Sequence, residues 1–249
     1  MLAQIVLTPA ESKKLIAKAV ARLKTVRKAA DRGIVAIHPS SSTYFIVEEL
    51  TGSKPKTNYW VCGVVSPRGM CVEMAMAVGA ELTPHEERVD PGDLQGTWVR
   101  EKCRQGREEK LSTLLYRMTS SDVYVKVEKL IPIPVKEAAR EAKFTRYDSG
   151  MGMPVGLYPC PSGDTIDEVR AIEILSGATA IPIASGGLGG AEGAVTFILK
   201  GDSQKVKKAL DFVEQSKGAR LPNLRLCNCN DCPVPNCEFP MIDKKWNLS

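Results

Sequence analysis

Four cysteines lie close together near the C-terminal end of the sequence, among asparagine, aspartate and proline residues. They are Cys227, Cys229, Cys232 and Cys237, in the stretch LCNCNDCPVPNCEFP with the spacing C-x-C-x2-C-x4-C. The turn-forming residues between them allow all four sulfurs to reach one centre. Four thiolates suit tetrahedral zinc or an iron–sulfur cluster. The spacing therefore predicts a metal site built from these four residues.

The identity of the metal stays open, with a small preference for an iron–sulfur cluster. Many zinc sites bring together two CxxC units that are distant in the sequence, and this compact group has no such arrangement. Its spacing also differs from the two-residue gaps of bacterial ferredoxins. Disulfides and free thiols are the other interpretations. The remaining cysteines are scattered, and only Cys160, in LYPCPSG, is a further candidate ligand; the others are Cys62, Cys71 and Cys103.

A run of four hydroxyl side chains, Ser40, Ser41, Ser42 and Thr43, separates an apolar stretch from a helical pattern. GIVAIH (33–38) reads as a strand, and TYFIVEELTG (43–52) reads as a helix. The unpaired N–H groups at a helix N-terminus attract anions, and the hydroxyls add donors. We expect a phosphate, carboxylate or pyrophosphate to bind here. The alternative is that one hydroxyl caps the helix and the others face solvent.

Three further residues are weak candidates for catalysis. Lys126 and Glu128 alternate with valines in a predicted strand, so both can point to one face. A lysine there would neutralise a phosphate, and a carboxylate would move a proton. His38 ends the predicted strand before the serines, where ligands bind in open α/β sheets. Each has an ordinary alternative, as a surface charge or a structural histidine.

The order of these segments resembles a known superfamily. A helix, then GIVAIHPSSSTYFIVEEL, and later DVYVKVEKL are similar to the start of ribose-5-phosphate isomerase, glucosamine-6-phosphate deaminase and the CoA transferases, over residues 15–130. The resemblance implies a mostly parallel sheet and a phosphate or CoA pocket at the serine run. The sequence departs from these families at His38-Pro39, where the isomerase loop is rich in glycine, and it lacks the acidic signature and the CoA-transferase glutamate motif. The resemblance therefore implies a fold and a pocket but no specific activity.

Strand and helix patterns alternate along the chain, which predicts an α/β protein in three parts. Residues 1–147 form the mostly parallel α/β domain, residues 148–218 form a smaller ferredoxin-like α+β domain, and residues 219–249 form the cysteine-rich tail. Within the second part, the glycine-rich stretch GGLGGAEG (186–193) precedes a strand rather than a helix. That order excludes a dinucleotide fingerprint. It leaves a hairpin connection or an anion loop containing Glu192.

Local signals predict where several helices begin and end. TPAE (8–11) and TIDE (165–168) are capping-box patterns, in which the threonine caps the helix that follows. Asp202 is the expected cap of a later helix. Gly52 is expected to end the helix that follows the serine run.

Composition limits the classes of partner. The 249 residues are 43% hydrophobic and 25% charged, as in ordinary globular proteins. No apolar run approaches the roughly 18 residues of a membrane span, and no secretory signal is recognisable, so we expect a cytoplasmic protein with no membrane partner. Residues 1–32 hold eight Lys or Arg and only two acids. This basic segment is either a solvated helix face or a source of positive potential that steers an anion toward the protein. Aromatic residues do not interleave with these charges, so we expect no nucleic acid partner.

The sequence thus predicts an intracellular metalloprotein that binds a small anionic ligand. The main hypothesis is an enzyme acting on a phosphorylated or CoA-linked small molecule, with zinc or an iron–sulfur cluster as cofactor. The alternative is a non-catalytic anion-binding or sensor protein whose metal is structural. The sequence does not decide between an enzyme and a binding protein, and it leaves open whether the chain forms a homo-oligomer.

Overall fold

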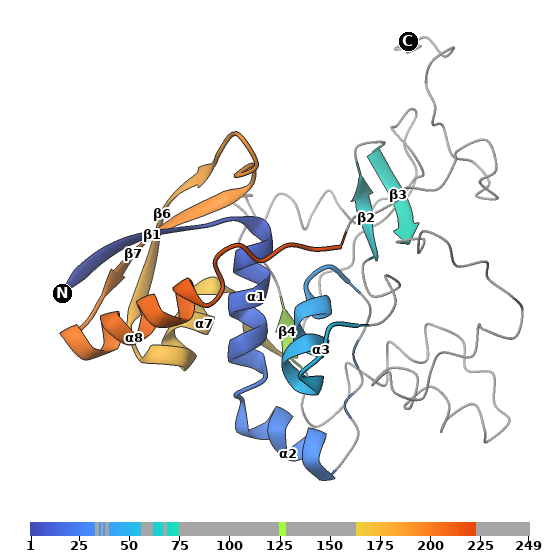
Figure 1. Cartoon of the computed structure of the whole chain (residues 1–249), viewed down its shortest axis with the longest axis horizontal. Coiled ribbons are helices and arrows are strands. Elements are labelled where there is room, and N and C mark those ends of the chain that lie inside the picture. The colour runs from blue at the N-terminus through green and yellow to red at the C-terminus, as the bar shows by residue number, and fades with distance from the viewer. Residues whose placement is uncertain are drawn as a thin grey trace, which may run out of the picture.

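The structure is a computed structural model that describes residues 1–32, 35, 37, 40–55, 62–66, 69–74, 125–127 and 163–222. For residues 32, 62–66, 69–74 and 125–127 it describes the backbone alone. The helices are α1 (Pro9–Val20), α2 (Lys24–Arg32), α3 (Thr43–Thr51), α7 (Glu168–Ser176) and α8 (Ser203–Glu214) (Figure 1). The strands are β1 (Leu2–Leu7), β2 (Cys62–Ser66), β3 (Gly69–Met74), β4 (Val125–Val127), β5 (Asp164–Ile166), β6 (Thr179–Gly186) and β7 (Ala194–Lys200).

The main described sheet is antiparallel and has the strand order β1-β7-β6. Strand β1 pairs with β7 so that Ile5 lies opposite Phe197, and β6 pairs with β7 on the other side. Strands β2 and β3 form a separate antiparallel pair, and only β4 and β5 pair in parallel. The described residues therefore form a mixed α/β fold. They do not support the mostly parallel sheet that the sequence predicted, because the strands with the longest ladders are antiparallel neighbours.

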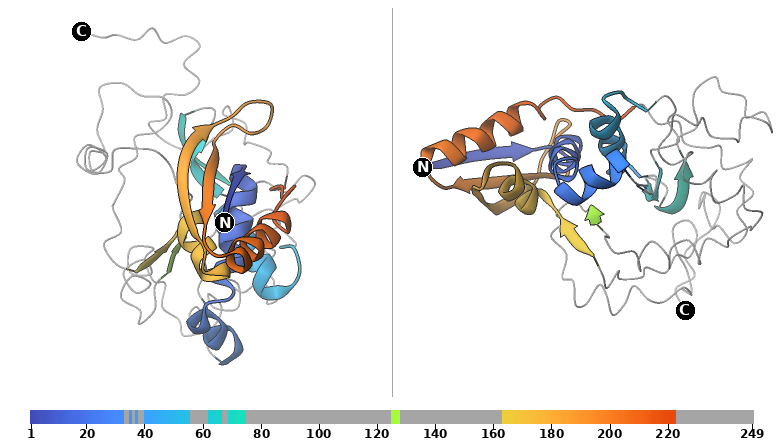
Figure 2. Two further views of the ribbon diagram at one scale, coloured as in Figure 1. Left: turned by 90° about the vertical axis from the view of Figure 1, so that its left-hand side faces the viewer. Right: turned by 90° about the horizontal axis from the view of Figure 1, so that it is seen from below.

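Alternation along the strands gives the main sheet one buried and one exposed face. In β1, Ile5 and Leu7 are buried, as are Phe197 and Leu199 in β7. These side chains join one core with residues of α1, α3, α7 and α8, and those helices lie on one side of the sheet (Figure 2). Side chains with the opposite parity, such as Ile183 in β6, are exposed. The helices therefore draw their stability from burial against a single sheet face.

Polar residues at the helix starts fix where three helices begin. At α1, the predicted capping box is present, because Glu11 accepts a hydrogen bond from the backbone N–H of Thr8 at 2.9 Å. At α7, Asp167 is the cap and accepts from Arg170 N at 2.8 Å. The sequence had placed Thr165 in that role, but Thr165 lies in β5. At α8, Asp202 is the cap, as predicted.

The basic N-terminal segment forms two helices, α1 and α2, with a break after Val20. Ala21 to Leu23 form the turn between them, and α2 ends at Arg32, before Gly33. Helix α1 lies between the sheet and α3, whereas α2 projects away from the sheet at one end of the molecule (Figures 1 and 2). Two neighbouring segments of similar composition therefore have very different surroundings.

The two ends of the described chain share one sheet and one core. Strand β1 pairs with β7, and α1 packs beside α7 and α8. Residues 2–20 therefore fold together with residues 163–218, although the sequence assigned them to different domains. The predicted boundary at 147/148 lies outside the described residues. In the part of the chain that the structure describes, no helix is both long and apolar enough to cross a membrane.

Candidate anion-binding site

The serine run forms the entry to helix α3. The Oγ atom of Ser40 accepts hydrogen bonds from the backbone N–H groups of Ser42 at 3.2 Å and Thr43 at 3.1 Å. Its carbonyl oxygen accepts from Tyr44 N at 3.1 Å. Ser40 therefore caps the helix, although it lies three residues before Thr43, the first residue of α3. The hydroxyls of Ser41 and Ser42 stand in the turn that follows.

Helix α1 brings a cation to this turn. The Nζ atom of Lys13 donates to the Oγ atom of Ser41 at 2.5 Å, across 28 residues of sequence. A lysine ammonium has three donors, and the hydroxyl of Ser41 accepts one of them. The turn thus combines a positive charge, hydroxyl groups and the positive end of a helix dipole, which together suit a small anion.

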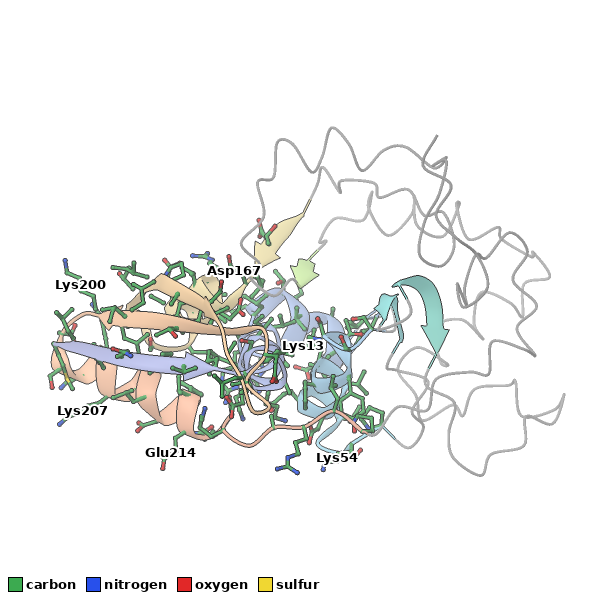
Figure 3. The ribbon with its side chains drawn as sticks, turned by 90° about the horizontal axis from the view of Figure 1, so that it is seen from above. Lys13, Lys54, Asp167, Lys200, Lys207 and Glu214 are labelled. Atoms are coloured by element: carbon green, nitrogen blue, oxygen red, sulfur yellow. The ribbon has the colours of Figure 1, made fainter. Side chains whose placement is uncertain are left out.

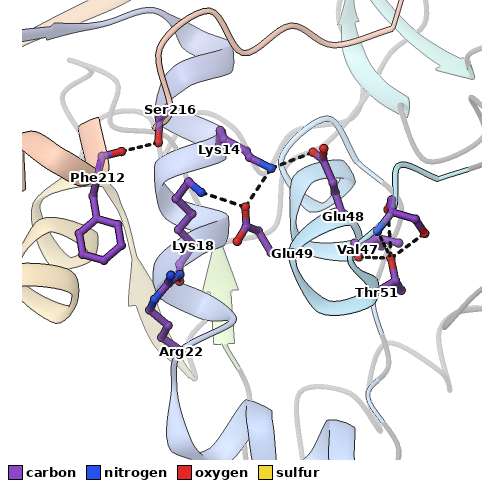
Figure 4. A network of polar contacts seen from close by, with 10 residues as sticks. Lys14, Lys18, Arg22, Val47, Glu48, Glu49, Thr51, Phe212 and Ser216 are labelled. Carbon is purple, nitrogen blue, oxygen red and sulfur yellow. Dashed lines mark hydrogen bonds and ion pairs between the residues drawn. The ribbon is translucent and has the colours of Figure 1, made fainter. Parts of the chain in front are cut away.

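A group of ion pairs fixes α3 beside α1 and so sets the position of the serine turn. Lys14 Nζ lies 2.9 Å from a carboxylate oxygen of Glu48 and 2.9 Å from one of Glu49 (Figure 4). Lys18 Nζ lies 3.3 Å from the same oxygen of Glu49. The side chains of Lys14 and Glu49 are only 15% and 16% exposed. Ion pairs this sheltered from water are screened less than surface pairs.

These contacts shift the pKa values of the group. Burial raises the pKa of Glu49, but the hydrogen bonds and charges of Lys14 and Lys18 outweigh burial and hold that pKa below its usual value. Burial lowers the pKa of Lys14, but the two glutamates outweigh it and raise that pKa. Both directions favour the charged forms, so this interface between the two helices stays ionised at neutral pH.

Aromatic packing holds the first turn of α3. Tyr44 and Phe45 are 5% and 3% exposed, and their rings meet edge to face at 5.3 Å between centroids. Lys14 Nζ lies 5.6 Å from the Phe45 ring centroid, within range of a cation–π contact. The turn that precedes these residues is therefore anchored on a rigid base, a common requirement for a binding site.

The other candidate residues stay predictions. His38 and Glu128 lie outside the described residues, as do Cys227, Cys229, Cys232 and Cys237. Lys126 lies in β4, where its backbone is in register with Thr165 of β5. Among the described residues, no group of three or more His, Cys, Asp or Glu side chains is placed to hold a metal ion. The described geometry accordingly brings together the serine turn and Lys13, and nothing further of the predicted sites.

The glycine-rich stretch 186–193 connects β6 to β7 as a hairpin. Glu192 accepts a hydrogen bond from the backbone N–H of Gly190 at 2.9 Å, within the loop itself. Gly187 has a φ of 141°, and a Cβ atom there would overlap the carbonyl oxygen of Ala191. The glycine at this position is therefore required by the tight turn. These contacts explain the composition of the loop without a ligand.

Sequence reasoning missed Lys13 as a member of the serine site. Lys13 was counted only as one of eight basic residues in the N-terminal segment, and its spacing from the serines carries no local signal. Its helical neighbours give one hint, because Lys14 and Lys18 recur at i, i+4 and predict a lysine face. Glu48 of α3, which pairs with Lys14 on that face, lies 34 residues away, so the pairing depends on the tertiary fold.

Comparisons with known proteins gave no match. No protein-family model matches the chain, and neither a curated protein nor a solved structure matches it significantly.

Proposed function

We propose that the protein binds a small phosphorylated or CoA-linked ligand at the turn Ser40–Thr43, with Lys13 as its cation. The contact between Lys13 Nζ and Ser41 Oγ carries this proposal. It places an ammonium group where the sequence pattern, by itself, supplied only hydroxyls and a helix N-terminus. A phosphate oxygen accepts strong charge-assisted hydrogen bonds from such a group.

The second half of the proposal concerns the metal. Cys227, Cys229, Cys232 and Cys237 would hold an iron–sulfur cluster or zinc, which their compact spacing supports. The metal would serve an enzyme as a Lewis acid or a redox centre. The weak candidates Lys126, Glu128 and His38 would then supply proton transfer or phosphate contacts. We extend the proposal to a cytoplasmic location, in which thiolates stay reduced.

A non-catalytic binding or sensor protein is the alternative. One observation favours it: the first amide groups of the serine turn are occupied by Ser40 Oγ. A catalytic phosphate pocket uses such amides on its substrate, whereas a simple binding site can rely on lysine and hydroxyl groups. In this version the metal is structural, and the chain senses its anion without converting it.

We also propose a division of the chain into structural units. We infer that α7, β6, β7 and α8 belong to a ferredoxin-like unit, supported by the antiparallel ladder between β6 and β7 and by helices on one sheet face. The tail from 219 onward would then form a separate metal-binding segment.

A binding titration with a matched control tests the anion site. The probes are inorganic phosphate, a sugar phosphate and CoA, each titrated calorimetrically into the full chain. The variant K13M removes the cation, and K54M removes an exposed lysine just after α3 with the same change in charge (Figure 3). We expect K13M to weaken binding by about tenfold and K54M to leave it unchanged. Equal binding by wild type and K13M would remove Lys13 from the site.

Metal content tests the cysteine site independently. Protein purified without oxygen is analysed for iron, zinc and acid-labile sulfide, and its visible spectrum is recorded. Iron with sulfide supports a cluster, and one equivalent of zinc without colour supports a structural site. The variants C229S and C232S should lose the metal, while C62S should keep it. Protein without metal would contradict this half of the proposal and leave the anion site standing.

A further inference from the structure

Helix α2 presents a group of exposed cations that the proposed small-anion site does not use. These are Lys24, Arg27 and Lys28, and all three are exposed. Arg32 is the last residue of the same helix, and Asp31 is its only acidic residue. Among the described residues, none of the three exposed cations forms an ion pair with a carboxylate. The α2 basic face, made up of Lys24, Arg27 and Lys28, therefore offers its charge to solvent.

The placement of these charges does not help the helix to form. Lys24 stands at the N-terminus of α2, where the helix dipole disfavours a cation, and the first turn contains no acidic residue. Lys24 and Lys28 are four residues apart, as are Lys28 and Arg32, so like charges are neighbours on the helix surface. A bound polyanion would relieve both kinds of repulsion. The repulsion therefore favours a ligand with several negative charges.

The apolar side of α2 packs against the core of the protein. Leu23, just before the helix, and Val26 within it pack against the core as partly buried side chains. Helices that lie on a membrane surface insert exposed Leu, Phe or Trp into the lipid. The sequence of α2, KTVRKAADR, contains no such residue. These observations favour a charged polymer over a lipid bilayer as the partner.

The absence of aromatic residues from α2 indicates which kind of charged polymer is the better partner. Proteins that hold single-stranded nucleic acid stack its bases on aromatic rings, and residues 22–32 contain no aromatic side chain. A duplex keeps its bases stacked internally and presents phosphates to the protein. From Lys24 to Arg32 the helix rises by about 12 Å. Phosphates of one duplex strand are spaced by about 3.4 Å along the axis, so a helix of this length spans three or four consecutive phosphates.

We propose that the α2 basic face binds the sugar–phosphate backbone of double-stranded nucleic acid without reading its sequence. The expectation of no nucleic acid partner rested on the lack of a stacking platform, which a duplex does not require. Contacts to phosphate alone carry no sequence information and depend strongly on salt. The site is separate from the serine turn and does not depend on the small anion.

Fluorescence anisotropy of a labelled duplex, recorded at several salt concentrations, tests the proposal. Two duplexes of random sequence and about 25 base pairs are tested separately, one of DNA and one of RNA, because both carry the same phosphates. The test variant is K24Q/R27Q/K28Q/R32Q. The control variant K200Q/K205Q/K207Q/K208Q removes the same charge from exposed lysines of β7 and α8 (Figure 3). Circular dichroism and thermal unfolding show whether each variant is folded.

We expect the wild-type chain to bind with a dissociation constant of roughly 1 to 100 μM, and its affinity to fall steeply with salt. The α2 variant should lose at least about tenfold in affinity, and the slope of log K against log salt should become shallower by about 3 to 4. The control should stay near wild type. An equal loss in both variants would reduce the effect to general charge attraction and overturn the proposal.

Two further outcomes would also overturn it. One is the absence of duplex binding by the folded wild-type chain at low salt. The other concerns vesicles of phosphatidylcholine and phosphatidylserine. If the wild-type chain binds them, and the α2 variant loses this binding but keeps its affinity for the duplex, the partner is a membrane surface.

Discussion

Helices α1 and α2 follow each other in the sequence and both are rich in lysine, yet their charges have opposite surroundings. In α1, the charged side chains Glu11, Lys13, Lys14 and Lys18 all contact another element of the fold. In α2, the side chains of Lys24, Arg27, Lys28 and Asp31 are exposed and make no ion pair within the described part of the chain. A basic segment that looks uniform in sequence is therefore divided into charges that hold the fold and charges that face solvent.

The difference follows from where each helix packs. Helix α1 lies between α3, α7 and α8, so its long side chains are partly removed from water, and a charge removed from water needs a partner. Glu11 shows this clearly: it accepts hydrogen bonds from Lys217 Nζ at 2.7 Å and from Gly218 N at 3.0 Å, at the end of α8. Helix α2 contacts the core along one narrow stripe, so its cations keep their hydration.

Among single substitutions, the largest effect should come from removing the carboxylate of Glu11. Its side chain is 7% exposed, and it both completes the capping box of α1 and holds the turn after α8. We expect E11A to lower the free energy of unfolding by about 2 to 3 kcal/mol, the sum of a lost cap and lost charged hydrogen bonds. Urea unfolding followed by circular dichroism measures it.

The variant E214A is the control for E11A, because Glu214 is an exposed carboxylate on α8 (Figure 3). It should change the free energy of unfolding by less than about 0.5 kcal/mol. Equal effects of E11A and E214A would show that the position of a carboxylate in this fold matters little, and the contrast between the helices would fail.

Acid should weaken the interfaces of α1. For Glu11, burial raises the pKa, but the hydrogen bond from Lys217 and those from backbone N–H groups outweigh it, and the folded-state pKa is lowered. Glu49 is lowered in the same way. A lowered folded-state pKa gives stability that is present above the unfolded pKa, about 4.3, and is lost as the pH falls through the folded value.

Unfolding free energy should therefore be constant between about pH 6 and 8 and fall steeply below about pH 5. The variant E49Q should be less stable at pH 7 but should lose less on acidification, because one of the titrating groups is gone. An acid limb with the same slope in E49Q and wild type would contradict the assigned role of Glu49. The raised pKa of Lys14 matters only in alkali, where stability should fall as the pH rises through that value.

A smaller effect is expected at the end of α1, where Arg22 lies over an aromatic ring. Its guanidinium carbon is 4.9 Å from the Phe212 ring centroid, and Nη1 donates to the carbonyl oxygen of Lys18 at 2.9 Å. We expect F212L to cost about 0.5 to 1 kcal/mol through the lost cation–π contact. A double-mutant cycle with R22Q isolates that contact; a coupling energy of zero would show that the ring acts only through apolar packing.

The smallest change in the free energy of unfolding is expected from replacing Ser12 in α1. Ser12 is completely buried, and its Oγ atom has no hydrogen-bond partner among the described residues. Replacing it with alanine removes a buried polar atom without a partner and favours the helix. We expect S12A to leave the free energy of unfolding unchanged or to raise it by about 0.5 kcal/mol. A loss above about 1 kcal/mol would mean that the hydroxyl has an essential contact.

Local signals in the sequence predicted the local features well. The capping box at Thr8, the cap at Asp202 and the end of α3 at Gly52 are confirmed, because each depends on residues within one helical turn. The described residues do not support the mostly parallel sheet that was predicted for residues 1–147, because β1 pairs antiparallel with β7. Strand β1 and its partner β7 are separated by nearly the whole chain, and no local pattern encodes such a pairing.

The same limit applies to the site. The hydroxyl run was visible in the sequence, and its capping role at Ser40 follows from a helix start a few residues away. Lys13 reaches Ser41 only because Lys14 and Lys18 bind glutamates of α3. Side-chain exposure of α2, which separates its cations from those of α1, also depends on packing and not on composition.

The division of charges between the two helices is tested most directly by urea unfolding of two charge-matched variants, K14M/K18M and K24M/K28M. Each loses two lysines and keeps apolar stems of similar length. We predict that K14M/K18M loses about 2 to 4 kcal/mol, because Glu48 and Glu49 are left without their partners. We predict that K24M/K28M changes by less than about 0.5 kcal/mol. Equal losses in the two variants, or a larger loss in K24M/K28M, would contradict the account.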